Sequence, residues 1–186
     1  LKSKAKKIDL VEKFRSDANL LIVGSSWEKD EQILAHSLQE FKVQSLKFKG
    51  IIVPHEIHES HINQVERLFQ DFSPTRFSKV DEQNISDKNI LIVDTIGMLS
   101  SIYQYGHVAF IGGGFTKGIH NILEAATFGL PVLFGPNYNK FKEALDLIQI
   151  NGAFCVHNSE ELSKKLAQLF NDNNTYEKAS TIAAKY

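Results

Sequence analysis

The feature that most constrains the fold of this chain is a regular alternation of short apolar runs, rich in β-branched residues, with longer amphipathic runs. The short runs are strand candidates, at 19–24, 50–54, 76–80, 89–94, 107–112, 131–135 and 153–157. Several of them are continuously apolar, which is typical of strands covered on both faces, as in a parallel sheet. The run at 76–80 is the weakest of these strand candidates.

Amphipathic runs separate most of the strand candidates. The runs at 29–41 and 59–70 carry apolar residues at helical spacing, and further helical patterns follow the later strands. The order β-α-β-α-β-β-α-β-α-β-α-β-α predicts an α/β fold, a doubly wound and mainly parallel sheet with helices on both faces. In such a sheet, ligands bind beyond the carboxyl ends of the strands, where the strand order reverses.

Composition narrows the class of protein. The 186 residues are enough for one domain with a substantial core, and the net charge of −1 gives no basic excess for nucleic acid. The single cysteine, Cys155, excludes an internal disulfide and a Cys-based zinc site, and favours a reducing compartment. No apolar run approaches the ~20 residues needed to span a bilayer.

The basic start of the chain indicates a linker, and therefore a piece of a longer protein. The alternative is a native start with a basic surface helix.

The unusual chemistry of the chain gathers just after the predicted strands. The residues concerned are Ser25, Ser26 and Trp27; His55 and Glu56; Asp94, Thr95 and Gly97; Gly112 to His120; and Gly135 to Asn137. These positions share one edge of the predicted sheet, so the sequence predicts a binding site there.

Common motifs fail at these positions. Counted from Gly112, the sixth residue of a dinucleotide fingerprint is Lys117 rather than glycine, which weakens an NAD-dependent oxidoreductase. A P-loop is excluded because Ile119, not lysine, follows Gly118. The histidines in 55–61 lack the His-Glu-x-x-His pattern, so a solvated loop with one ligand-facing histidine is favoured over a metal site.

The glycine turn at 112–114 indicates phosphate. Glycines directly after a strand leave backbone N–H groups unshielded and permit positive φ. A helix is predicted to begin near His120 or Asn121, and its amide end suits an anion. Glu124 lies about one turn further on, where a carboxylate repels phosphate but can accept hydrogen bonds from two ribose hydroxyls. Phosphate and ribose together indicate a nucleotide. The alternative is that Asn121 and Glu124 form only a capping pair.

The stretch from Gly112 to Pro136 resembles the C-terminal signature of 3-deoxy-D-manno-octulosonic acid (Kdo) transferases, which have the two-domain GT-B fold. Its His-Asn-x-Leu-Glu block with Gly-Pro behind it is the specific part, and the segments 24–31, 53–59 and 94–114 agree in order. Two positions depart from the family pattern: His55 stands where arginine is usual, and Met98 where many members carry glutamate. Arg76 and Lys79 are candidates to replace that arginine.

The resemblance implies an inverting glycosyltransferase that transfers Kdo from CMP-Kdo to a lipid A precursor in lipopolysaccharide biosynthesis, with no metal on the nucleotide and no other cofactor. It assigns 1–18 to a linker from an N-terminal domain, 19–170 to the donor-binding domain and 171–186 to a C-terminal helical tail. The N-terminal domain is expected to hold the acceptor and the catalytic carboxylate. We therefore expect this part to be soluble and inactive alone, and the full-length enzyme to lie at the cytoplasmic face of the inner membrane.

The same reading gives the expected donor-binding residues. They are Ser25, Ser26, His55, Asp94, Thr95, Ile96, Gly97, Met98, Gly112, Gly113, Gly114, Phe115, Gly118, His120, Asn121 and Glu124. The glycines are expected to let the backbone approach the donor, and the amides of 119–121 to hold its phosphate with His120 as an added donor. Backbone groups of 94–98 are expected to frame the cytosine. Ser25 and Ser26 are expected to contact the phosphate or the Kdo carboxylate.

Two other functions stay open at this point. Another GT-B glycosyltransferase or epimerase that uses a UDP donor shares the glycine turn and the ribose glutamate. A nucleotide-binding module without catalysis is the other alternative.

Overall fold

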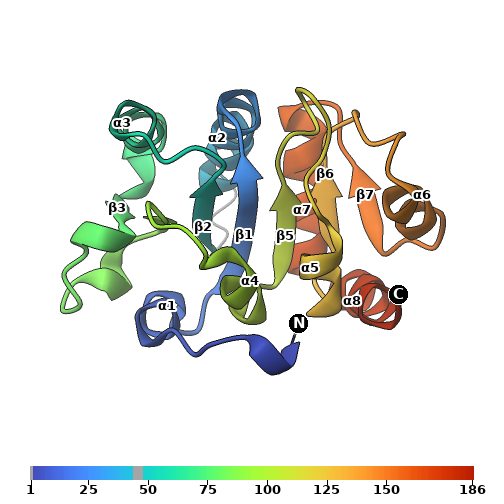
Figure 1. Cartoon of the computed structure of the whole chain (residues 1–186), viewed down its shortest axis with the longest axis horizontal. Helices are drawn as coiled ribbons and strands as arrows, with labels where there is room; N and C mark the ends of the chain where they lie inside the picture. The colour runs from blue at the N-terminus through green and yellow to red at the C-terminus, as the bar shows by residue number, and fades with distance from the viewer. Residues whose placement is uncertain (1, 44–47) are drawn as a thin grey trace.

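The computed structural model of the chain describes residues 2–43 and 48–186, and these form a seven-stranded sheet in which every paired strand is parallel. The strands are β1 (Asn19–Ser26), β2 (Phe48–Pro54), β3 (Pro74–Arg76), β4 (Ile90–Ile92), β5 (Val108–Ile111), β6 (Val132–Phe134) and β7 (Ala153–Cys155). Figure 1 shows the sheet running across the molecule. The predicted doubly wound α/β fold is confirmed.

The strand order identifies the place where the winding reverses. The order across the sheet is β3-β4-β2-β1-β5-β6-β7, so β2, β3 and β4 lie on one side of β1, with β4 between β2 and the edge strand β3. The chain then crosses to the other side of β1 and lays β5, β6 and β7 there. The register pairs Gly24 with Ile111 at the carboxyl ends of β1 and β5. The crevice between these two ends is where a sheet of this kind binds ligands.

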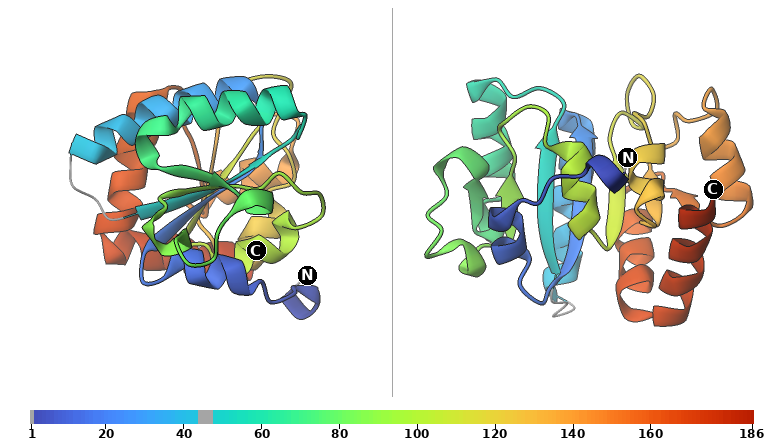
Figure 2. Two further views of the ribbon diagram at one scale, coloured as in Figure 1. Left: turned by 90° about the vertical axis from the view of Figure 1, so that its left-hand side faces the viewer. Right: turned by 60° about the horizontal axis from the view of Figure 1, so that its bottom comes forward.

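Helices cover both faces of the sheet, as the two views of Figure 2 show. One apolar core lies under α2 (Glu28–Val43), α3 (Glu59–Leu68) and α7 (Ser159–Asn171). The other lies under α1 (Asp9–Arg15), α4 (Leu99–Ile102), α5 (Leu123–Thr127) and α6 (Lys142–Gln149). The last helix, α8 (Asn173–Lys185), contacts α5 and α7 and gives residues to both cores.

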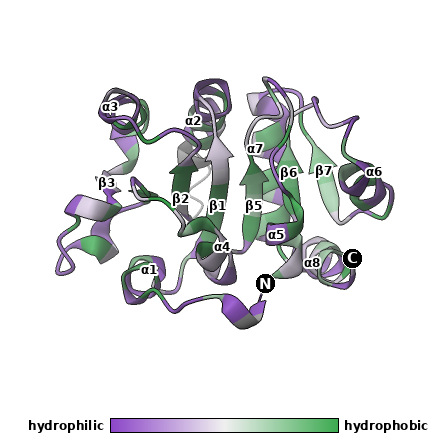
Figure 3. Ribbon diagram, viewed as in Figure 1, coloured by the Kyte–Doolittle hydropathy of each residue, from purple (hydrophilic) through white to green (hydrophobic). Residues whose placement is uncertain are grey.

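The strands divide their side chains between the two cores because neighbouring residues of a strand point to opposite faces. Leu20 and Ile22 of β1 lie in one core, whereas Leu21 and Val23 lie in the other, and all four are fully buried. Figure 3 shows the resulting hydrophobic strands and the hydrophilic loops that connect them. Burial on both faces explains why these runs are continuously apolar.

The strand predicted at 76–80 is wrong in its bounds. β3 ends at Arg76, and a short 3-10 helix occupies Phe77–Lys79. The reason lies in long-range polar contacts: the Arg76 side chain is buried, and Ser78 is bonded to Asp94. The contact of Ser78 with Asp94 joins residues 16 positions apart, and no local pattern reveals it.

Both end segments pack on the domain. Val11 and Phe14 of α1 are fully buried in the core that also contains Ile22 and Leu91. Ala179 and Ala183 of α8 are buried as well. The proposed boundaries at residues 18 and 170 stay predictions. Within 2–43 and 48–186, none of the helices is both long and apolar enough to cross a membrane.

Candidate functional site

Three aromatic rings meet at the carboxyl edge of the sheet, next to the point where the strand order reverses. Trp27 follows β1, His55 follows β2, and His120 lies between the glycine turn and α5. The indole N–H of Trp27 donates to Nε2 of His120 over 3.0 Å, and the planes of the two rings are nearly parallel, at 14°. The ring of His55 stacks on both, with centroid distances of 4.4 Å to Trp27 and 4.5 Å to His120. The structure thus brings two predicted site residues together and adds Trp27.

Burial and neighbouring charged groups affect the protonation of His120 and the charge close to the three rings. Burial lowers the pKa of His120, the nearby His55 lowers it further, and Asp30 opposes this effect. The ammonium of Lys117 lies 5.7 Å from the centroid of the Trp27 ring, within range of a cation–π contact. The site therefore combines three groups: the imidazole of His120, whose neutral form is favoured, the exposed imidazole of His55, and the ammonium of Lys117. Such a set suits an anion.

A buried carboxylate fixes the glycine turn to this cluster. Oδ2 of Asp30 accepts hydrogen bonds from the backbone N–H groups of Trp27, at 2.9 Å, and Gly113, at 2.8 Å. The side chain is fully buried, and its Oδ1 has no partner in the part of the chain that the structure describes. Burial raises the pKa of Asp30, although the amides of Gly113, Trp27 and Phe115 act in the opposite direction.

Sequence reasoning missed Asp30. Acidic residues are common in the first turn of a helix, where they oppose the helix dipole, and Asp30 occupies that place in α2. Nothing local separates it from its neighbour Glu28. The distinguishing contact, to Gly113, joins residues that are far apart in the sequence.

The glycines of the turn are required by the packing of the protein itself. A Cβ on Gly112 would lie 2.3 Å from the carbonyl oxygen of Ser25, and one on Gly114 would lie 2.5 Å from the backbone nitrogen of Gly135. Gly113 has a φ of +89°, a conformation that favours glycine. The turn thus packs tightly between the ends of β1 and β6, which is a different reason for these glycines from the predicted clearance for a donor.

The predicted free amides are a second correction. The N–H of Ile119 donates to the carbonyl of Asn137, at 3.3 Å, and that of His120 donates to the carbonyl of Gly112, at 3.2 Å. The helix starts at Leu123, later than predicted, and has five residues. The turn is closed by backbone hydrogen bonds, so the imidazole of His120, rather than its amide, is free for a ligand.

Asn121 and Glu124 form a hydrogen-bonded pair at the start of α5, as in the alternative that the sequence left open, although the N-cap position itself is Ile122. Oδ1 of Asn121 accepts from the N–H of Leu123 at 3.0 Å, and its Nδ2 donates to Oε1 of Glu124 at 3.1 Å. Oε2 of Glu124 makes no hydrogen bond with any described residue, and the side chain is half-buried. The pair therefore holds the carboxylate in place with one oxygen directed to no other residue of the described chain.

The two serines after β1 differ in their environments. Ser25 has a φ of +52° and sits at a register shift between Gly24 and Ser26. Such left-handed residues are costly and gather at functional sites. Ser26 is fully buried, and its hydroxyl donates to Oε1 of Glu31 at 2.8 Å. Burial raises the pKa of Glu31, while the neighbouring His61, 3.2 Å away, opposes this. Of the two serines, Ser25 is the more available to a ligand.

The loop after β4 exposes its backbone. Asp94 accepts hydrogen bonds from the N–H of Ser78, at 3.0 Å, and from its hydroxyl, so its carboxylate holds the short 3-10 helix that follows β3. The hydroxyl of Thr95 lies 2.9 Å from the sulfur of Met98. Between them Ile96 is 88% exposed, and Gly97 turns with a φ of +84°. This loop forms a ledge of exposed backbone at the same edge of the sheet.

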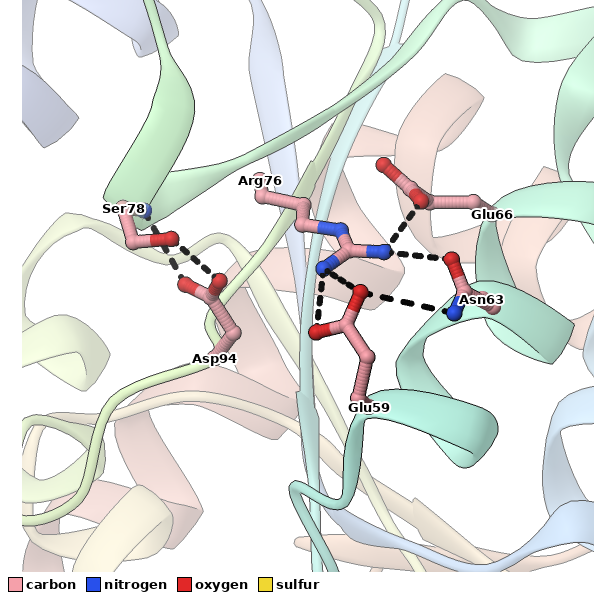
Figure 4. A network of polar contacts seen from close by, with 6 residues as sticks. All are labelled: Glu59, Asn63, Glu66, Arg76, Ser78 and Asp94. Atoms are coloured by element: carbon pink, nitrogen blue, oxygen red, sulfur yellow. Dashed lines mark hydrogen bonds and ion pairs between the residues drawn. The ribbon is translucent and has the colours of Figure 1, made fainter.

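Arg76 is clamped inside the protein, which contradicts the expectation that it replaces the arginine missing at position 55. Its side chain is 4% exposed, and its guanidinium donates to both carboxylate oxygens of Glu59, each at 2.9 Å. The other terminal nitrogen donates to Asn63 and Glu66, both at 2.7 Å (Figure 4). The acceptors sit on one face of α3, since their spacing is helical. Lys79 is exposed and stays a candidate for that role.

The remaining predicted site residues, Phe115 and Gly118, lie in the segment that follows the glycine turn. Phe115 is 8% exposed and packs on Phe110, so its side chain belongs to the core. Gly118 has a φ of +132° and helps to line a hollow of about 280 Å³ beside the turn. Its other lining residues are Thr116, Lys117, Asn137, Asn139, Lys140 and Phe141. The described residues contain no group of three His, Cys, Asp or Glu side chains that could hold a metal ion.

Comparison with known proteins gives the relationships of the chain. The chain is 31% identical over 161 residues to a 3-deoxy-D-manno-octulosonic acid transferase from Rickettsia bellii. The match covers 85% of this chain and 38% of that protein, so the chain spans little more than a third of the relative's length. No protein-family model matches the chain.

Solved structures share the fold. The C-terminal CMP-Kdo binding domain of WaaA from Acinetobacter baumannii superposes with a TM-score of 0.79 and 22% identity, covering 96% of this chain and 98% of that one. A putative UDP-N-acetylglucosamine 2-epimerase from Listeria monocytogenes has a TM-score of 0.65 and 14% identity, covering 98% of this chain and 46% of that one. These similarities confirm the predicted fold, the Rossmann-like C-terminal half of a GT-B protein.

Proposed function

We propose that this chain, which is homologous to the Kdo transferases, is the donor-binding part of an inverting glycosyltransferase that transfers Kdo from CMP-Kdo to a lipid A precursor. The observation that carries the proposal is the convergence of Trp27, His55 and His120 with the pair Asn121–Glu124 at the reversal of strand order, in a chain of this ancestry.

The geometry supports a specific arrangement of the nucleotide. The unpaired Oε2 of Glu124 is suited to the ribose hydroxyls, because a carboxylate accepts hydrogen bonds and donates none. The exposed backbone of 95–97 is suited to one edge of the cytosine. The groups left to bind the phosphate are the imidazole of His120 and the ammonium of Lys117. The backbone amides of Ile119 and His120 are not available, because each already donates a hydrogen bond to a backbone carbonyl of the protein.

The chemical contribution of this half is to stabilise the leaving group. When the bond from the anomeric carbon to the phosphate oxygen breaks, negative charge grows on CMP. Fixed donors and cations such as His120 and Lys117 lower the energy of that charge without needing to reorganise. The base that activates the acceptor is expected in an N-terminal domain, and the proposed reaction needs no metal on the nucleotide. The lipid acceptor places the full enzyme at the inner membrane.

Titration calorimetry with CMP tests the proposal, and UDP serves as the competing ligand. We expect this chain to bind CMP in the micromolar to millimolar range and to bind UDP more weakly. Failure to bind CMP at millimolar concentration contradicts the proposal. Tighter binding of UDP favours the second candidate, a UDP-using GT-B enzyme, for which the shared fold with the Listeria monocytogenes epimerase is the supporting observation.

A transferase assay distinguishes the proposed function from the third alternative, a nucleotide-binding module without catalysis. The full-length protein is incubated with CMP-Kdo and a lipid A precursor, and release of CMP is followed. The proposal predicts CMP release that depends on the acceptor and falls when Glu124 is replaced by alanine. Binding of CMP without any acceptor-dependent release supports the module instead.

A further inference from the structure

We propose that Trp27 is a positioning residue for the donor: its indole N–H fixes the His120 ring in the tautomer whose Nδ1–H points its proton at the anionic group of the ligand. This inference rests on the proposed function only for the identity of the ligand. The positioning itself is a property of the free protein and can be tested without any ligand.

The direction of the hydrogen bond decides the tautomer. The indole Nε1–H of Trp27 can only donate, and it lies 3.0 Å from Nε2 of His120. Nε2 must therefore offer a lone pair, which places the ring proton of neutral His120 on Nδ1. A protonated imidazolium would put two N–H groups face to face, so this contact disfavours the charged form.

The rings around His120 hold its plane as well as its proton. The planes of Trp27 and His120 are nearly parallel, at 14°, and the hydrogen bond of 3.0 Å joins the two rings at their nitrogens. The ring of His55 stacks on both, with centroid distances of 4.4 Å to Trp27 and 4.5 Å to His120. The backbone N–H of His120 is tied to Gly112. Rotation of the His120 ring would break the bond to Trp27, so the donor at Nδ1 keeps one direction.

The charged groups facing His120 come from several elements. Asp30 of α2 lies close enough to favour its protonation, whereas His55 and burial oppose it, and the net effect is a lowered pKa. Lys117 lies over the Trp27 ring and supplies a permanent positive charge beside the cluster. Glu31 of α2 is buried and engaged with Ser26 and His61. At neutral pH the cluster thus offers a directed neutral donor together with one lysine.

The ligand group that fits is an oxyanion, because an N–H donor and an ammonium both favour one. CMP-Kdo carries two such groups, the phosphate and the Kdo carboxylate, and their chemistry toward His120 is shared. Titration with CMP, which has only the phosphate, and with free Kdo, which has only the carboxylate, separates them. The group that loses affinity in the Trp27 variant is the one that His120 contacts.

The first experiment reads the tautomer in the free chain. Nitrogen-15 NMR of the histidine side chains is recorded for the wild type, for Trp27→Phe, which keeps an aromatic ring but lacks the N–H, and for His120→Gln, which assigns the His120 signals. We expect protonation at Nδ1 alone in the wild type, and a mixture of tautomers with a raised His120 pKa in Trp27→Phe. Protonation at Nε2 in the wild type, or an unchanged tautomer in Trp27→Phe, overturns the inference.

The second experiment links the tautomer to the ligand. Trp27→Phe is expected to weaken CMP or Kdo binding about threefold to tenfold, the size of one hydrogen bond. In the His120→Gln background the same change should cost nothing more, because the two residues act as a unit. An equal loss in both backgrounds overturns the inference, since Trp27 then acts independently of His120. Absence of CMP binding to the wild type overturns the proposed function instead, and the NMR result still decides the tautomer.

Discussion

The buried carboxylate of Asp30 accepts a hydrogen bond from the backbone N–H of Gly113 over 2.8 Å, across 83 positions of the sequence. It also accepts from the N–H of Trp27, so one internal anion fastens the glycine turn to the end of β1. An amide that the sequence offers to a phosphate is thus taken by the protein, and at this turn the phosphate must rely on side chains.

Removal of this anion should destabilise the fold. We expect Asp30→Ala to lower the free energy of unfolding by about 2–4 kcal/mol, because buried amides lose their acceptor. Asp30→Asn should cost less, since it keeps a carbonyl oxygen as an acceptor and avoids the burial of a charge. Urea unfolding of both variants measures the two values.

The matched control for Asp30 is Glu28→Ala, an exposed acid in the first turn of the same helix. Its effect should stay within about 0.5 kcal/mol. An Asp30→Ala protein as stable as the Glu28→Ala protein would show that Asp30 does not hold the turn.

The left-handed conformation of Ser25 separates stability from binding. With a φ of +52°, Ser25→Gly should raise the free energy of unfolding by up to about 1 kcal/mol, because glycine adopts this conformation without strain. The same change should weaken CMP binding, because it removes a hydroxyl from the site. Ser73→Gly, with a φ of +48° away from the site, should stabilise similarly and leave CMP affinity unchanged. If Ser25→Gly binds CMP as the wild type does, Ser25 has no part in the site.

The Arg76 clamp should matter for stability alone. Arg76→Met is expected to cost about 2–3 kcal/mol, less than the ~3–5 kcal/mol of a fully buried pair. The reason for the lower value is that the Glu59 side chain is 70% exposed and can be hydrated after the change. Chemical denaturation gives the cost, with Lys79→Met as the exposed control. A loss of CMP affinity in Arg76→Met without a loss of stability would assign Arg76 to the ligand after all.

A half-buried histidine, His107, should make the fold sensitive to acid. Burial, and to a smaller extent Arg15, lowers the pKa of His107 from its ordinary value of 6.5, and Tyr176 stacks on its ring at 4.7 Å. As the pH falls below about 6.5, the unfolded chain takes up a proton that folded His107 refuses, so the free energy of unfolding falls.

The comparison of wild type with His107→Phe isolates this effect, because every other titrating group is common to both proteins. Unfolding free energies at pH 7.5 and 5.5 should show a steeper loss in the wild type than in His107→Phe. His107 lies away from the site, so CMP affinity at pH 7.5 should be equal. An identical pH slope in the two proteins contradicts the lowered pKa.

Glu124 is expected to recognise the ribose through its free oxygen. Glu124→Ala should weaken CMP binding about 10- to 100-fold, the range for a hydrogen bond to a charged group. A CMP analogue without the 2′ and 3′ hydroxyls is the control, because it should bind the wild type and Glu124→Ala equally weakly. Calorimetry with both ligands reads the difference. A similar loss for both ligands would show that Glu124 acts only through the capping pair with Asn121.

The sequence predicts well whatever depends on local pattern. The strands from Asn19, Ile90 and Val108 are visible because burial on both faces demands continuous apolar residues. The edge where ligand chemistry gathers follows from the parallel order of those strands. The Asn121–Glu124 pair is also predictable, since its members are only three positions apart in the sequence.

Contacts between distant segments were not predictable in the same way. The bond from Trp27 to His120 joins residues 93 positions apart, and no local signal marks it. The role of the glycines was misjudged because the chain segments beside Gly112 and Gly114 are known only from the fold. The contacts of Arg76 have a partial signal in the sequence, because Glu59, Asn63 and Glu66 are spaced so that they share one face of a helix. Two carboxylates on one face favour a cation beside them.

The most direct test of the account is to map CMP on this chain by NMR. Backbone amide shifts are followed while CMP is added to the nitrogen-15-labelled protein. We expect saturable shifts at residues 25–27, 95–98 and 112–124, with α1 and α8 unaffected. Absence of shifts at millimolar CMP, or shifts centred away from these three segments, would contradict the central claim that this edge of the sheet binds the nucleotide of the donor.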